Sequence, residues 1–92
     1  MIVGKVVGNV WATRKEEGLS GMKLMVVRHL DACTNEELDT LVAVDFIGAG
    51  IGERVLVATG SSARNAGDTT CKAPVDATIV GIIDEVEVQE GV

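Results

Sequence analysis

The sequence TLVAVDFIGAGIGERVLVAT, residues 40–59, decides the fold class. Its first part, Thr40–Ile47, is apolar apart from one aspartate, which predicts a strand that is covered on both faces. Its last part, Arg54–Thr59, is rich in β-branched and aliphatic residues and predicts a second strand. The glycine-rich turn between them predicts a hairpin in which one or more glycines adopt positive φ. The glycines of this predicted hairpin turn are Gly48, Gly50 and Gly52.

Outward from this stretch, three more segments have the composition of strands, namely Ile2–Thr13, Met22–Leu30 and Val75–Val88. The intervening residues 14–21, 31–39 and 60–74 are polar and predict loops. In the last of these, Ser61 or Ser62 is placed to cap a short helix over Ser62–Ala66. Together these elements predict an all-β fold, a five-stranded OB-like β-barrel with one short α-helix. We expect residues 1–92 to form a single domain.

The composition predicts an oligomer. Although the chain has only 92 residues, 47% of them are hydrophobic, and its mean hydropathy is +0.31. A domain of this size has a thin core. Valine and glycine are abundant, whereas Trp11 and Phe46 are the only aromatic residues besides His29. This apolar surplus suggests burial between subunits.

The charge is distributed unevenly along the chain. The formal net charge is −6, but residues 1–30 carry five cations and two anions, whereas residues 31–92 carry three cations and twelve anions. A molecule with one basic and one acidic region can pair with copies of itself.

The net negative charge and the shortage of aromatic residues disfavour nucleic-acid binding, which OB barrels perform with basic grooves and stacking side chains. No apolar run is long enough for a membrane helix, and two cysteines fit a reducing cytosol.

Motifs for chemistry are weak. The turn sequence GAGIG precedes a strand, so it lacks the helix N-terminus that a dinucleotide site needs. His29, Cys33 and Cys71 are too few for a structural zinc site. A hydrolase would have to use His29 with Ser61 or Ser62, and neither serine lies in a G-x-S-x-G elbow. Two alternative hypotheses therefore remain, an OB-type module that binds a small anion or an oligonucleotide, and a small enzyme dependent on His29.

Five segments carry a family resemblance through their order and spacing. They are GNVWATRK (8–15), LSGMKLMVV (19–27), VAVDFIGAGIGERVLV (42–57), GSSAR (60–64) and PVDATIVGIIDEV (74–86). Together they span essentially the whole chain, which resembles the EutN/CcmL family of vertex proteins from bacterial microcompartment shells. The amino-acid sequences of the third and fourth segments are more similar to family members from catabolic compartments than to those from carboxysomes.

The resemblance implies a function in assembly. It implies a homopentamer with a narrow axial channel that caps the fivefold vertices of a microcompartment shell in the bacterial cytoplasm, among hexameric shell proteins. It implies no catalysis, no cofactor, and neither a nucleic-acid nor a membrane partner. We expect Ser61, Ser62 and Arg64 to lie near a subunit contact or the channel. A capped helix end close to the symmetry axis could face the centre of the ring, where its backbone N–H groups would favour anions.

Overall fold

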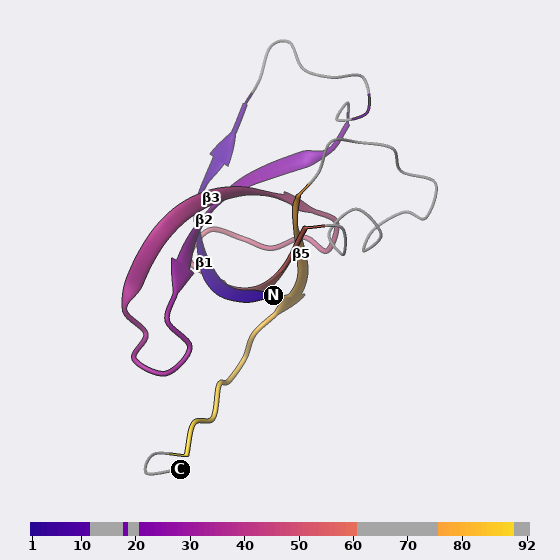
Figure 1. Ribbon diagram of the computed structural model, residues 1–92. Helices are drawn as coiled ribbons and strands as arrows, with labels where there is room; N and C mark the ends of the chain where they lie inside the picture. Colours follow the sequence, from indigo (N-terminus) through magenta and orange to yellow (C-terminus); the bar gives the residue numbers. More distant parts are fainter. Residues whose placement is uncertain (12–17, 19–20, 61–75, 90–92) are drawn as a thin grey trace.

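The computed structural model describes residues 1–11, 18, 21–60 and 76–89, and this part of the chain folds into a barrel of strands (Figure 1). The strands are β1 (Ile2–Val10), β2 (Lys23–Leu30), β3 (Glu37–Asp45), β4 (Arg54–Thr59) and β5 (Ala77–Ile82). The described residues contain no α-helix, and none that is long and apolar enough to cross a membrane. The helix predicted over Ser62–Ala66 lies outside the described residues.

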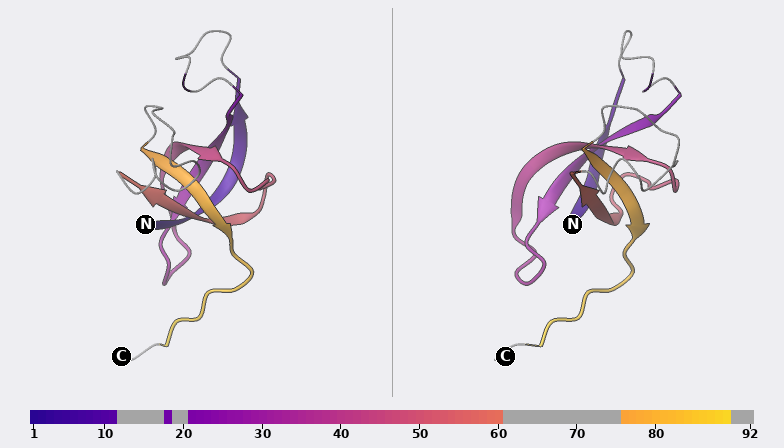
Figure 2. Two further views of the ribbon diagram at one scale, coloured as in Figure 1. Left: turned by 90° about the vertical axis from the view of Figure 1, so that its right-hand side faces the viewer. Right: turned by 45° about the vertical axis from the view of Figure 1, so that its right-hand side comes forward.

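The strands form a closed barrel in the order β1-β2-β3-β5-β4, with β4 returning to β1. All neighbours are antiparallel except β3 and β5, which run parallel and pair through Val44 with Thr78 and Asp45 with Ile79. In Figure 2, β5 (orange) forms part of the barrel wall, where it lies between β3 and β4. A closed five-stranded barrel of mixed strand direction is the OB-like architecture that the sequence predicts.

The topology corrects the predicted hairpin. β3 pairs with β2 and β5, whereas β4 pairs with β1 and β5, so the two strands are not neighbours in the barrel. The segment with Gly48, Gly50 and Gly52 is therefore a crossover at one end of the barrel and not a hairpin turn. The physical reason is closure, because β4 is used to join β1 and β5 and is unavailable to β3.

Several strand boundaries also differ from the prediction, and the largest differences are at the start of β3 and the end of β5. β3 begins at Glu37 and not at Thr40, because polar side chains are tolerated on a sheet face that meets water. β5 ends at Ile82 and not at Val88, although the sequence alternates as far as Val88. Within the described residues, the last backbone hydrogen bond of this strand runs from the Ile83 N–H to the Arg54 carbonyl. The alternation therefore continues past the point where a partner strand exists.

The barrel interior is small and aliphatic. Its largest fully buried side chains belong to Met25, Ile79, Val6, Val27, Val55, Val57 and Thr78. Gly4 lies among them because a Cβ at this position would overlap Cγ1 of Val27. The absence of a side chain there lets β1 approach β2 closely, which packs the narrow barrel.

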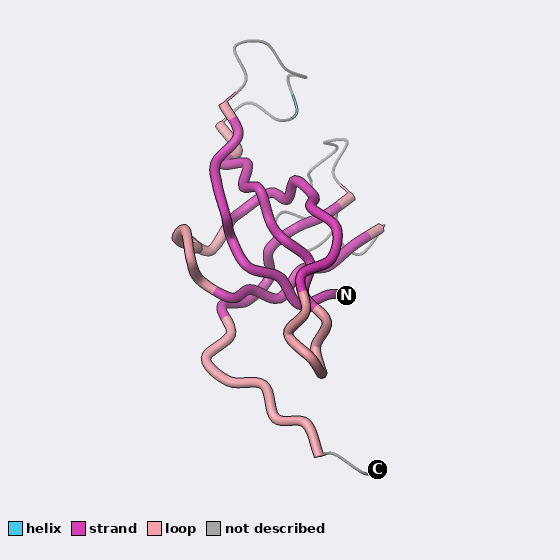
Figure 3. The backbone as a smooth tube through the Cα atoms, turned by 90° about the vertical axis from the view of Figure 1, so that its left-hand side faces the viewer, coloured by secondary structure: helices cyan, strands magenta, loops and turns pink. Residues whose placement is uncertain are grey.

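Residues 83–89 leave the barrel after β5. In Figure 1 and Figure 3 this segment runs away from the strands and ends far from them. The molecule is elongated, with extents of 48 × 24 × 20 Å, and this segment lies at one of its ends. Within the described residues of one subunit, residues 84–89 make no backbone hydrogen bond or ion pair that would hold this extension in place.

Candidate functional site: surfaces for self-assembly

The crossover between β3 and β4 is organised by one buried carboxylate. Asp45 accepts hydrogen bonds from the backbone N–H groups of Ile47 at 2.9 Å, Gly48 at 3.1 Å and Ala49 at 2.8 Å. Its Oδ2 also lies 3.7 Å from the Nζ of Lys23. Three converging N–H groups turn the chain sharply after β3, since a carboxylate can accept several donors at once.

Glycine conformation completes the crossover. Gly48 and Gly52 have positive φ, 86° and 92°, as the sequence predicts for one or more glycines of this segment. Gly50 is not among the residues with positive φ. The N–H of Gly52 donates to the Val6 carbonyl, and the Val6 N–H donates to the Glu53 carbonyl. The crossover is therefore fixed to β1 as well as to its own carboxylate.

The fixed crossover presents apolar side chains to solvent. Ile51 is 63% exposed, and Phe46 and Ile47 beside it are also exposed. Trp11, which follows β1, is 91% exposed. Other large exposed apolar side chains are Met1, Val7, Leu38, Val42, Ile82 and Val88. So many exposed apolar side chains are uncommon on a monomer of this size and are typical of surfaces that other subunits cover.

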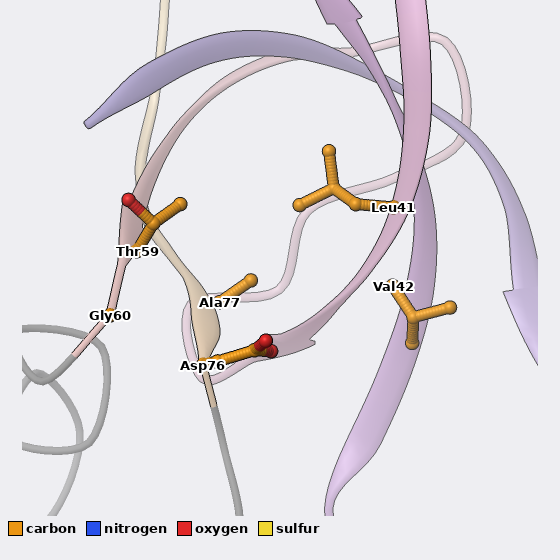
Figure 4. A pocket seen from close by; sticks show the side chains of 6 residues that line it. All are labelled: Leu41, Val42, Thr59, Gly60, Asp76 and Ala77. Carbon is orange, nitrogen blue, oxygen red and sulfur yellow. The ribbon is translucent and has the colours of Figure 1, made fainter.

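A shallow pocket of about 260 Å³ lies between β3 and the adjoining ends of β4 and β5 (Figure 4). It is lined by Leu41, Val42, Thr59, Gly60, Asp76 and Ala77. The Gly60 N–H donates to the Asp76 carbonyl at 2.8 Å, so the two ends of the intervening segment are held together. Ser61, Ser62 and Arg64 belong to that segment and lie outside the described residues.

Of the residues considered for metal binding or catalysis, the structure describes only His29, on β2, and Cys33. Cys33 is exposed in the β2–β3 loop, and Cys71 lies outside the described residues. No group of three or more metal-ligating side chains occurs in the part of the chain that the structure describes. Backbone hydrogen bonds from Thr34 and Cys33 lower the pKa of Asp31, which shapes this loop. Asp31 is thus engaged in loop structure.

The strand register reveals a cluster that sequence reasoning missed. Lys5 on β1 lies opposite Arg28 on β2 and opposite Arg54 on β4. These residues are 23 and 49 positions from Lys5 in the sequence, so only the barrel brings them together. We call these three residues the basic row.

The closed barrel and the exposed apolar side chains together indicate a small OB-like protein of the class that assembles with copies of itself. Comparison with known proteins gives the family. The family model described as "Ethanolamine utilisation protein EutN/carboxysome" matches residues 1–84. The chain belongs to this EutN/CcmL family, as the sequence motifs predicted.

Individual relatives make the relationship concrete. The chain is 48% identical over 89 residues to the bacterial microcompartment shell vertex protein GrpN of Rhodospirillum rubrum, covering 95% of this chain and 97% of GrpN. It is 43% identical over 89 residues to the carboxysome shell vertex protein CcmL of Synechococcus elongatus, covering 97% and 89%. The solved structure of the R. rubrum GrpN pentameric shell protein matches with a TM-score of 0.86 at 46% identity, covering 97% of this chain and all of GrpN. The chain is therefore a microcompartment shell protein of the vertex class.

Proposed function

We propose that five copies of this chain, each acting as a single domain of residues 1–92, form the ring that closes a vertex of a microcompartment shell in the bacterial cytoplasm. The match over nearly the full length of both chains to the pentameric GrpN structure carries this proposal. The exposed apolar side chains support it, because a closed ring buries a surface on both sides of every subunit.

In this role the chain is a structural protein and not an enzyme, and it requires no cofactor. Its outer contacts are with hexameric shell proteins. Five copies carry a formal charge of 5 × −6 = −30, so attachment to these neighbours depends on local complementary or apolar edges. The compartment is of the catabolic kind, and the matches to GrpN at 48% identity and to EutN at 43% are consistent with this.

We further propose that Ser61, Ser62 and Arg64 lie near a subunit contact or the axial channel. The support is their position in the chain. They follow Gly60, whose φ of 68° redirects the backbone beside the pocket between β3, β4 and β5. An Arg64→Ala variant should then alter ring stability or channel passage, and a structure of the ring with Arg64 on its outer rim would overturn the placement.

Native mass spectrometry tests the ring. The expected mass is about 48 kDa, five times the 9.6 kDa of one chain. A stable monomer or dimer would contradict the proposal. The shell role is tested by co-producing the chain with hexameric shell proteins and imaging the particles. Closed polyhedra should require the chain, and their formation without it would refute the vertex function.

A further inference from the structure

The basic row is unusual for an acidic protein. Lys5 lies between Arg28 and Arg54 on three adjacent strands, about 4.8 Å from one strand to the next. Like charges opposite one another destabilise a sheet unless an anion compensates them. Arg28 is partly compensated, because its Nε donates to Thr40 at 2.9 Å and its guanidinium lies 3.5 Å from Glu37.

In the part of the chain that the structure describes, the other two cations lack such partners. Lys5 is exposed and forms no ion pair within the part of the chain that the structure describes. The Nε of Arg54 is buried, yet it makes no hydrogen bond within the described residues. A buried donor without an acceptor is costly. The guanidinium of Arg54, like Lys5, has no compensating anion within the described residues.

An apolar groove borders the basic row. Val3 and Leu56 form the neighbouring cross-strand pair, two residues along β1 and β4 from Lys5 and Arg54. Together with residues of the β2–β3 loop and the N-terminus they line a groove of about 450 Å³. The outer face of the barrel therefore places a positive strip directly beside an apolar one.

Residues 84–89, which we call the C-terminal segment, have the complementary pattern. Glu85 and Glu87 alternate with Val86 and Val88, so in an extended chain the acids project to one side and the valines to the other. Within the described residues, the segment makes no backbone hydrogen bond and no ion pair. All views show it running away from its own barrel (Figures 1, 2 and 3).

We propose that the C-terminal segment of one subunit lies across the outer face of a neighbouring subunit, between its basic row and its apolar groove. Glu85 and Glu87 face the cations, and Val86 and Val88 face the groove. The glutamates are about 7 Å apart in an extended chain, within the roughly 10 Å that three strands span. The occupant is thus a second copy of this chain, and the inference rests on the proposed ring.

Disulfide trapping in the full chain tests this docking. Val3→Cys and Val88→Cys are combined in a background where Cys33 and Cys71 are replaced by serine, and the assembled protein is mildly oxidised. We expect a ladder of covalently linked chains, up to five, on a non-reducing gel. The matched control carries Asn9→Cys, an exposed position on the same strand, with Val88→Cys. It should give at least tenfold less ladder.

A second arm tests the charges. Lys5→Glu should reduce the ladder severalfold at low salt, and adding Glu87→Lys should restore it, because the pair is then reversed and not broken. A disulfide within single chains, or an equal ladder in the control, would overturn the proposal. Native mass spectrometry of the same samples separates the two hypotheses. A pentamer without a ladder refutes only the docking, whereas a monomer refutes both.

Discussion

Replacement of Asp45 should be among the most destabilising single changes in this chain. Asp45→Ala removes the acceptor of three backbone N–H groups. The hydrogen bond from Ala49 is buried, so its lost partner costs about 1–3 kcal/mol. The other two are half-buried and can turn to water, at about 0.5–1.5 kcal/mol each. The free energy of unfolding should therefore fall by about 2–6 kcal/mol.

Two further variants separate the hydrogen bonds from the ion pair. Asp45→Asn keeps one oxygen for Ile47 and Gly48 but places an NH₂ group against the Ala49 N–H, so it should cost about 2–3 kcal/mol. Lys23→Ala removes the ion pair and a 3.3 Å hydrogen bond from the Lys23 Nζ to the Ala49 carbonyl, and because that side chain is 52% exposed it should cost only about 1 kcal/mol.

Urea denaturation provides the measurement, with all variants at one chain concentration because assembly adds to stability. A loss of 3 kcal/mol corresponds to a fall in Tm of roughly 12–24 °C for a domain of this size. If Asp45→Ala costs no more than Lys23→Ala, the crossover does not depend on the carboxylate and the reasoning is refuted.

Three further predictions concern the barrel and its loops. Gly4→Ala should destabilise by about 1–3 kcal/mol in urea denaturation because the new methyl group meets Val27, whereas Gly8→Ala has room and should cost much less. Gly52→Ala should cost about 1–2 kcal/mol because its φ is 92°, and an unchanged urea midpoint would contradict this. The carboxyl of Asp31 should titrate below 3.8 by NMR because backbone hydrogen bonds from its own loop lower its pKa. Since its folded-state pKa is depressed, its stabilising contribution is present above pH 3.8 and is lost as the pH falls through the folded-state pKa; a midpoint above 3.8 would contradict this.

Local patterns predicted the strands but not their partners. Each of the five strands was found in the sequence because aliphatic residues with turn signals between them mark single segments. The pairing was missed at β3 and β4, because a glycine turn between two strands indicates a change of direction and not which strand lies alongside. Parallel pairing of β3 with β5 depends on residues more than 30 positions apart, which no local pattern reports.

The same limitation applies to the candidate site. Asp45 was visible only as a polar exception in an apolar strand, and its role became clear from three N–H groups that converge on it. The basic row was invisible because its members are scattered over three strands. A search for cross-strand neighbours would have found it, but that search requires the register, which depends on closure of the barrel.

The fold places the cations of the N-terminal part and the acids of the C-terminal part on two separate surfaces. The N-terminal part of the sequence is basic, and β1 and β2 contribute Lys5 and Arg28 to the basic row. The C-terminal part is acidic, and Glu85 and Glu87 project on a segment that leaves the barrel. Had the acidic end folded back on its own barrel, the charges would be satisfied within one subunit and would favour a monomer. Because the segment points away, a cyclic arrangement satisfies every basic row with the segment of a neighbour, and only a closed ring leaves none unpaired.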